Sequence, residues 1–377
     1  MAVREPALTL GLEEEYLLVE RETGAVAAEP PDELFAALHE RTAGRAFPEF
    51  LRAQVEVATP VCADIGEARR ELTGLRRAVI EEAARFGLAP IAASSHPFSL
   101  TAKQKRTEKE RYIALLEEMQ GAARRMMICG LHVHVGVEDD NLRIDLMNQL
   151  TYFLPHLLAL SCSSPFWEGE RTGLMSFRLM IFNGLPRTGL PEQFTGWGEY
   201  RRHTDVLVET GIIADTSRIW WDLRPSARYP TLETRVMDCC TSLEDALSLA
   251  ALNQCLVRML WRLRRANQRW RVYSHLLLAE NRWRAMRYSY DAGLLDLGRQ
   301  SIVPYAELLE ELIALVAEDA AALGCAAEIE RLREILARGT SAHRQVAVYE
   351  QAIGRGATQD EALGEVVGWL VEETARV

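Results

Sequence analysis

Residues 11–18 read GLEEEYLL, a segment in which acidic and apolar side chains alternate. Successive side chains of a β-strand point to opposite faces, so residues two apart share a face and lie roughly 7 Å from each other. Glu13 and Glu15 therefore share one face of the expected strand with Gly11. The other face carries Leu10, Leu12, Glu14, Tyr16 and Leu18. The pattern predicts a strand with an apolar back and an acidic front.

Three other segments repeat this alternation. In LHVHVGV, His132 and His134 lie on one face and the valines on the other. In TLETRVMD, Glu233 and Arg235 share a face, and in QVEVAT the carboxylate of Glu56 faces away from two valines. If the apolar backs are buried against helices, the fronts together form a concave wall of carboxylates with two imidazoles and an arginine.

Each part of this wall has a simpler explanation when taken alone. Glu13 and Glu15 fit a solvated strand face, because exposed polar alternation is common in antiparallel sheets. The two histidines fit a buried, hydrogen-bonded pair. Glu233 with Arg235 fits a surface cross-strand pair. Four strands with the same pattern favour one shared site over four separate coincidences.

The rest of the chain sets the fold class. Residues up to about 240 mix short alternating segments with helices, whereas later residues read almost wholly at helical spacing. We expect an α+β fold in which helices flank an antiparallel sheet. Residues 1–377 are expected to form a single catalytic domain, with a sheet-bearing part at 1–240 and a mainly helical flank at 241–377.

The local patterns predict the following elements. Strands are expected at residues 8–19, 54–59, 88–93, 128–137, 178–182, 218–224 and 231–237. Helices are expected at residues 65–86, 105–127, 143–161, 242–265, 305–323, 326–338 and 360–375. Ser242 and Asp245 have the spacing of a capping box at the start of the fourth helix.

Composition excludes several classes of function. The net charge of −11 disfavours extended contact with nucleic acid or an anionic membrane. The only lysines are Lys103, Lys105 and Lys109, so the chain has no GxxxxGK[ST] phosphate-binding loop. The seven cysteines show no CxxC spacing, and the sequence shows no secretion signal or membrane span. We expect reduced thiols and a cytoplasmic protein.

Carboxylates at this density repel one another and raise one another's pKa, so a divalent cation is the natural compensation. Oxygen ligands with an occasional imidazole suit Mg or Mn better than zinc. Two such ions can bridge the terminal phosphates of ATP and neutralise the charge that develops during phosphoryl transfer.

Other charged and aromatic residues also carry predictions. Glu14 interrupts the apolar face of its strand, so we interpret it as a buried group paired with an arginine. Trp220 and Trp221 alternate faces, so at most one of them can line a cavity. The rigid donor fork of arginine suits a substrate carboxylate or phosphate, and surface ion pairing is the alternative for each candidate, namely Arg178, Arg224 and Arg228.

Longer motifs resemble a known family. In chain order they are GLEEEY, QVEVATP, ASSHPFS, ICGLHVHVGV, SSPFWEGERTG, RPSARYPTLETRVMD and ENRWRAMRYS. These segments span residues 11–287, and GTSAHRQ at residues 339–345 extends the likeness. Together they resemble the carboxylate-amine ligases, also called glutamate-cysteine ligase type 2. That family is similar in fold and active site to glutamine synthetase, which implies a sheet funnel with ATP and metals at one end and the acceptor carboxylate at the other.

The resemblance also implies roles for single residues. It implies metal ligands at Glu13, Glu15, Glu56, His132 and Glu233, with His132 also serving the phosphates. It implies that Arg235 stabilises the transferring phosphoryl group. His134 and Arg224 are implied to contact substrate or nucleotide.

The implied reaction uses ATP and Mg or Mn in two steps. A glutamate-like carboxylate attacks the γ-phosphorus of ATP, and an amine, classically that of cysteine, then displaces phosphate from the acyl phosphate. The partners are these small molecules and, by family likeness, a second copy of the chain in a homodimer.

Two other functions compete with this reading. A metal-dependent hydrolase could use the HxH motif and the acids, although such a site usually has more histidines. The remaining ones lie in no matching motif: His39, His96, His156, His203, His275 and His343. A non-catalytic helical interaction protein would leave the acidic wall unexplained.

Overall fold

The centre of the protein is a seven-stranded antiparallel sheet, seen in a computed structural model that describes residues 4–377, with Arg111 described by its backbone only. The strand order is β10-β11-β5-β1-β3-β2, and β4 also pairs with β1. The strands are β1 (Leu10–Glu20), β2 (Ala46–Pro48), β3 (Gln54–Ala58), β4 (Leu88–Ile91), β5 (Leu131–Gly136), β10 (Leu223–Pro225) and β11 (Thr231–Thr234). The expected α+β class and antiparallel sheet are confirmed.

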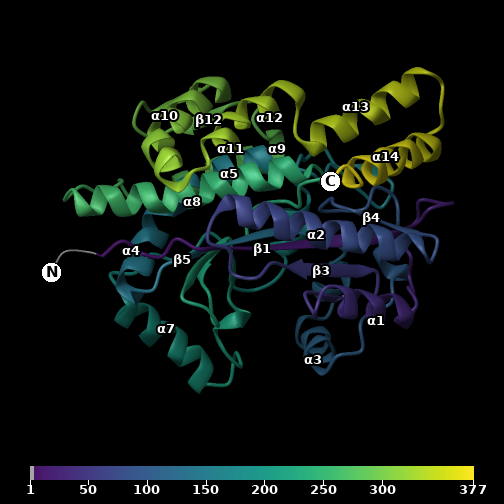
Figure 1. The fold of residues 1–377 in the computed structure, drawn as a ribbon, viewed down its shortest axis with the longest axis horizontal. Helices are drawn as coiled ribbons and strands as arrows, with labels where there is room; N and C mark the ends of the chain where they lie inside the picture. The colour runs from purple at the N-terminus through teal and green to yellow at the C-terminus, as the bar shows by residue number, and fades with distance from the viewer. Residues whose placement is uncertain (1–3) are drawn as a thin grey trace.

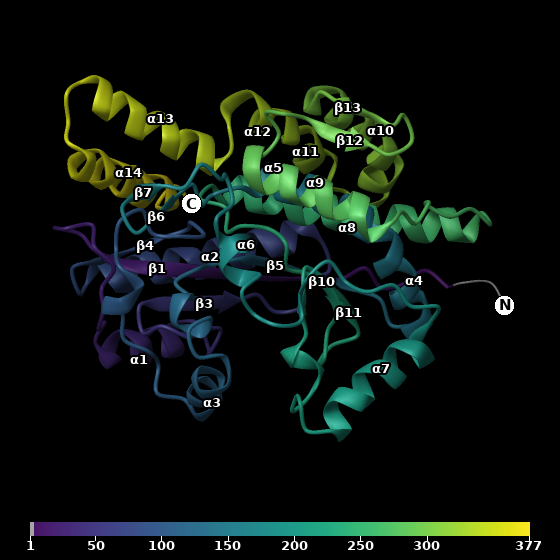
Figure 2. The same ribbon diagram turned by 180° about the vertical axis from the view of Figure 1, so that it is seen from behind.

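Helices cover the apolar back of this sheet. The helices α2 (Ile65–Ala84) and α8 (Leu243–Arg265) pack against β1, and α8 also packs against β5. Figure 1 shows α8 and the later helices along one side of the sheet, and α1, α3 and α7 on the other side. In Figure 2 β10 and β11 lie beside β5, on the side where α7 lies. The front of the sheet therefore faces loops and short elements instead of a continuous helical layer.

The remaining elements surround these two layers. The other helices before α8 are α1 (Asp32–Arg41), α3 (Glu110–Met119), α4 (Asp140–Leu150), α5 (Leu154–Ser161), α6 (Arg178–Phe182) and α7 (Trp197–Glu209). Those after it are α9 (His275–Tyr288), α10 (Tyr305–Leu323), α11 (Ala326–Glu330), α12 (Leu332–Arg338), α13 (Ser341–Gly354) and α14 (Gln359–Thr374). Three small sheets pair β6 (Phe166–Trp167) with β7 (Glu170–Arg171), β8 (Thr188–Gly189) with β9 (Trp220–Trp221), and β12 (Leu294–Asp296) with β13 (Ser301–Val303).

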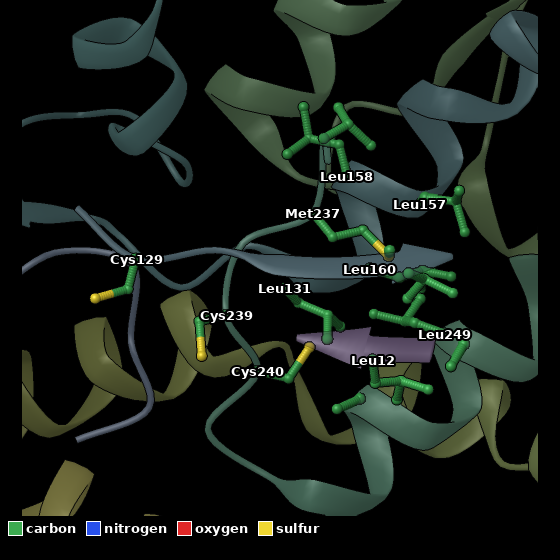
Figure 3. Close-up of a cluster of buried hydrophobic side chains, with 14 of the residues drawn as sticks. Leu12, Cys129, Leu131, Leu157, Leu158, Leu160, Met237, Cys239, Cys240 and Leu249 are labelled. Carbon is green, nitrogen blue, oxygen red and sulfur yellow. The ribbon is translucent and has the colours of Figure 1, made fainter. Parts of the chain in front are cut away.

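The core lies between the sheet and the helices. Leu12 of β1, Leu131 of β5 and Leu249 of α8 are buried in one cluster, which Figure 3 shows together with Met237 and leucines of α5. All seven cysteines are free and buried, as their scattered spacing predicts. None of the helices in the described part of the chain has the length and apolar composition needed to cross a membrane.

Glu14 is paired with an arginine inside this core, as predicted. Arg76 of α2 donates from Nη2 to Glu14 Oε1 at 2.7 Å and from Nε to Glu14 Oε2 at 3.1 Å, and both side chains are fully buried. Tyr16 also donates to this carboxylate. Arg76 further donates to the carbonyl oxygens of Cys240 and Thr241. The pair thus connects β1, α2 and the segment that leads into α8.

Several local predictions were wrong. Residues 178–182 form the helix α6 instead of a strand, because an apolar run of five residues fits either periodicity. The expected helix at 105–127 is helical over Glu110–Met119 with a 3₁₀ turn at Ala123–Arg125, since Arg106 pairs in extended conformation with Leu51.

Other boundaries also moved. The expected helix at 143–161 is two helices, α4 and α5, separated by a 3₁₀ turn just before Pro155. The expected strand at 218–224 is divided between β9 and β10. Ser242 is the N-cap of α8, but its side chain makes no capping hydrogen bond, and Asp245 instead accepts hydrogen bonds from Arg338. The helices α1, α7, α9 and α13 were not predicted.

Candidate active site

Strand register brings the polar fronts into one row. Glu13 of β1 lies opposite His132 of β5, and Glu233 of β11 lies opposite both His134 of β5 and Arg224 of β10. Directly opposite residues of antiparallel strands have Cβ atoms roughly 5 Å apart. One cavity of about 650 Å³ is lined by every residue expected to act in the site, namely Glu13, Glu15, Glu56, His132, His134, Arg224, Glu233 and Arg235.

Three of these side chains form a group suited to a metal ion. Glu13, His134 and Glu233 each offer one ligand atom, and these atoms lie within 4.8 Å of one another. We call these three residues the first acidic cluster. Two carboxylates and one imidazole are a ligand set that fits Mg or Mn.

The orientation of His134 supports this fit. Its Nδ1 lies 2.9 Å from Thr231 Oγ1, and its Nε2 lies 3.4 Å from Glu13 Oε1. This Nε2 is buried and has no hydrogen-bond partner among the described residues. Metal-binding histidines typically donate their other ring N–H to a neighbouring oxygen, which leaves one nitrogen facing the metal. His134 has this arrangement.

His132 lies beside the first acidic cluster. Its Nδ1 lies 3.1 Å from Glu13 Oε2. Burial, together with the charge of Arg235, lowers the pKa of His132 to about 4, so the ring is neutral near pH 7. Because an ionised carboxylate only accepts hydrogen bonds, Nδ1 carries the proton and Nε2 carries the free lone pair.

Arginines hold Glu233 in its ionised form. Arg224 donates two hydrogen bonds to it, from Nε at 2.9 Å and from Nη2 at 3.0 Å, and Arg235 Nη1 donates a third. Burial raises the pKa of Glu233, but the charges of Arg235 and Arg224 outweigh burial and hold the pKa well below its usual range. Arg235 lines the cavity, and its Nε is buried without a hydrogen-bond partner in the described chain.

A second acidic cluster consists of Glu15, Glu49 and Glu56, which line the same cavity. Glu15 and Glu56 lie opposite each other in the register of β1 and β3. Burial and the charge of Glu49 raise the pKa of Glu15 to about 7, against a hydrogen bond donated by the Gly130 N–H at 2.8 Å. Burial and the charges of Glu13, Glu49 and Glu15 raise the pKa of Glu56 well above its usual range. A bound cation would relieve this repulsion.

Glu49 was missed by the sequence reasoning. It follows Pro48, the last residue of β2, and so lies outside any alternating segment. The hydroxyl of Tyr112 donates to Glu49 Oε2 at 2.5 Å. The sequence signal was its position in the short turn that leads into β3.

The predicted arginines and tryptophans occupy distinct places. The cavity is lined by Arg178 and Arg228 as well as Arg224, and by Trp220. Trp221 is absent from the described lining, in keeping with the prediction from strand alternation. Arg178 donates from Nη2 to the carbonyl oxygen of Arg235 at 3.1 Å and crosses Gly130, where a Cβ atom would lie only 2.4 Å from Arg178 Nη2.

Sequence comparisons place the chain beside named relatives. A family model described as glutamate-cysteine ligase family 2 matches residues 9–368. A Rhodospirillum rubrum protein provisionally named glutamate–cysteine ligase 2 is 58% identical over 376 residues, which cover 99% of this chain and 97% of the relative. A Paracoccus denitrificans protein of the same provisional name is 54% identical over 372 residues, 99% of each chain.

Solved structures share the fold at low identity. A glutamate–cysteine ligase from Francisella tularensis, in complex with AMP, matches with a TM-score of 0.69 and 12% identity, over 100% of this chain and 91% of that chain. A bifunctional glutathione synthetase from Pasteurella multocida matches with a TM-score of 0.70 and 16% identity. That match covers 97% of this chain, which spans about half, 52%, of the synthetase.

Proposed function

The chain belongs to glutamate-cysteine ligase family 2 and is therefore a carboxylate-amine ligase, and we propose that it uses ATP with Mg or Mn to form an amide through an acyl phosphate. The carboxylate is glutamate or a related acid, and the amine is cysteine or another amine. The observation that carries this proposal is the row of Glu13, His134 and Glu233, held in one cavity together with Arg235.

Each acidic cluster would hold one metal ion. Glu13, His134 and Glu233 are the proposed ligands of the first. His132, the imidazole that the family resemblance implies as a ligand, lies beside them against Glu13. Glu15, Glu49 and Glu56 are the proposed ligands of the second. When bound, these ions neutralise the phosphate charge and orient the reacting oxygens.

The arginines act on the phosphoryl group in this proposal. Arg235 lines the cavity and donates to the oxygens of the transferring phosphoryl group. Arg224 is held by the carbonyl oxygens of Ser217 and Ile219, at 2.9 and 2.6 Å, and fixes Glu233 through two hydrogen bonds. Donors fixed in advance stabilise developing charge without reorganisation, which is the main catalytic contribution that phosphoryl transfer needs.

The reaction then balances in two steps. A carboxylate oxygen attacks the γ-phosphorus, and ADP leaves with the bridging oxygen. The amine nitrogen attacks the acyl carbon, and phosphate leaves with the electrons of the carbon–oxygen bond. The proposal names no protein nucleophile, because the acyl phosphate is formed on the substrate itself.

Coupled ADP release tests the proposal. The purified protein is incubated with ATP, Mg, glutamate and a panel of amines, and products are identified by mass. ADP should appear only when metal, carboxylate and amine are all present, and Glu233→Gln should lower the rate roughly 100-fold or more. The control is Glu170→Gln, which alters an exposed carboxylate that is not among the described lining residues of the cavity.

Two outcomes would contradict the proposal. If no pair of substrates releases ADP, the ligase reaction is wrong. If the protein hydrolyses a substrate with metal but without ATP, the metal-dependent hydrolase is favoured. The homodimer, the cytoplasmic location and the single catalytic domain stay predictions from the sequence.

A further inference from the structure

The cavity has an apolar wall that the proposed phosphoryl transfer does not use. It consists of Phe50, Leu115, Met126, Phe182 and Leu185, which all line the cavity. These side chains come from the turn after β2, from α3, from the segment before β5, from α6 and from the loop after α6. Bulky apolar side chains in the lining of a charged cavity favour a ligand that carries an apolar group.

Two residues of this apolar wall belong to a small hydrophobic cluster. Ile128 packs with Phe182 and Leu185 in one hydrophobic cluster. Ile128 and His134 both line the cavity and are six positions apart along extended chain, so their Cα atoms are roughly 20 Å apart. His134 lies opposite Glu233, which binds Arg224 and Arg235. Arg224 and Arg235 beside Glu233 suit the triphosphate, and the apolar wall offers a different kind of surface, on which another substrate can pack.

The second acidic cluster borders the apolar wall. Glu49 adjoins Phe50 in the chain and binds Tyr112, whose ring meets the Phe50 ring edge-on at 5.7 Å. On the neighbouring strand, Phe47 lies directly opposite Glu56. Three carboxylates with one divalent cation leave a net negative charge. That charge favours an ammonium group beside the cluster.

We propose that the amine substrate carries an apolar or aromatic group, which packs on the apolar wall while its ammonium group faces the second acidic cluster. The inference rests on the proposed function and names its substrate class. In the second step the nitrogen bonds to the acyl carbon, and the carbon–oxygen bond to phosphate breaks. Of the two protons that the ammonium group loses, one goes to the departing phosphate and one to solvent.

The wall should discriminate strongly against polar amines. One methylene group in a hydrophobic pocket is worth roughly 10-fold to 200-fold in specificity. A polar group placed on this surface would lose its hydration without gaining a hydrogen bond. The short side chain of cysteine would cover only part of the five wall residues.

Two isosteric amines test the inference. Isopentylamine and 3-aminopropanamide have the same number of heavy atoms and the same branching, but the second carries a planar amide in place of the two methyl groups. With ATP, Mg and glutamate held constant, kcat/KM should be about 10-fold or more higher for isopentylamine. Cysteine is measured in the same series. Equal or faster use of 3-aminopropanamide or cysteine would overturn the inference while leaving the ligase proposal intact.

A matched pair of variants locates the effect. Phe182→Ala shortens a wall residue of α6, and should raise the KM for isopentylamine about 10-fold or more and leave the KM for ATP unchanged. Leu179→Ala is the control, because Leu179 is buried in the same helix and does not line the described cavity. If Phe182→Ala raises the KM for ATP instead, the wall holds the adenine base and the inference is wrong.

Calorimetry measures binding of the amine independently of the ligase reaction. Isopentylamine is titrated into the wild-type protein and into both variants. One outcome is that Phe182→Ala weakens this binding and Leu179→Ala leaves it unchanged, while no pair of substrates releases ADP. That result would contradict the ligase reaction but support the apolar binding site. If isopentylamine is neither bound nor turned over, the inference itself is wrong.

Discussion

The hydroxyl group of Thr231 sets the orientation of His134, because Thr231 Oγ1 lies 2.9 Å from His134 Nδ1 and leaves Nε2 facing Glu13. We expect Thr231→Val to keep the shape of β11 and to release the imidazole. Loss of such a supporting hydrogen bond typically weakens metal affinity about 10-fold to 100-fold. Titration of the protein with Mn²⁺, followed by electron paramagnetic resonance, measures this affinity directly.

Thr234→Val is the matched control for that change. Thr234 lies on the same strand but on the opposite face, where its hydroxyl group is within 3.1 Å of Asn253 Oδ1. This variant should lose some stability and keep its Mn²⁺ affinity. If the two variants bind Mn²⁺ equally well, Thr231 does not position a metal ligand.

The carboxyl group of Glu15 should make stability depend on pH in the metal-free protein. Burial and the charge of Glu49 raise its pKa from 4.5 to about 7. Between these values the folded protein holds a proton that the unfolded chain has lost, so stability falls as pH rises through this interval. Above pH 7 the loss amounts to at most about 3 kcal/mol.

Glu15→Gln should remove this contribution and still accept the Gly130 N–H hydrogen bond. In the presence of a chelator, urea denaturation should show the variant gaining stability over wild type at pH 8 and little at pH 5. An equal difference at both pH values would show that burial of the Glu15 charge is not what destabilises the site.

At the scale of elements, the Glu14–Arg76 pair fastens the central strand to α2. Arg76→Met would leave a buried carboxylate without its partner, which costs about 3–5 kcal/mol of the free energy of unfolding. The double variant Glu14→Leu, Arg76→Met should recover most of that loss, since neither charge then remains buried. Urea denaturation measures both.

An exposed ion pair supplies the comparison. Arg201 and Asp205 lie four residues apart on α7 and are both exposed, so Arg201→Ala should cost less than about 1 kcal/mol. If Arg76→Met costs no more than Arg201→Ala, the buried pair is not the connection between β1 and α2 that the structure indicates.

The elements that the sequence predicted well are those with a local, repeated signal. The alternation around Glu13, His132, Glu56 and Glu233 lies on β1, β5, β3 and β11, because periodicity two is readable within one segment. The run RLMIF at residues 178–182 has no such signal. Its helical form, α6, places Arg178 over Gly130, a contact that no pattern of five residues could predict.

At the scale of the whole molecule, face and register are different kinds of information. Alternation tells which side chains share a face, but the pairing of Glu15 with Glu56 and of Glu233 with His134 depends on how long connections close. Glu49 shows the same limit, since it reaches the cavity from a turn and not from a strand.

We infer that the four strand fronts form one cavity for ATP and two metal ions. The most direct test is an anomalous difference map from crystals grown with Mn²⁺ and a non-hydrolysable ATP analogue. We expect one Mn²⁺ peak among Glu13, His134 and Glu233, another among Glu15, Glu49 and Glu56, and the γ-phosphate near Arg235. Mn²⁺ and nucleotide bound elsewhere, with these side chains left unligated, would contradict it.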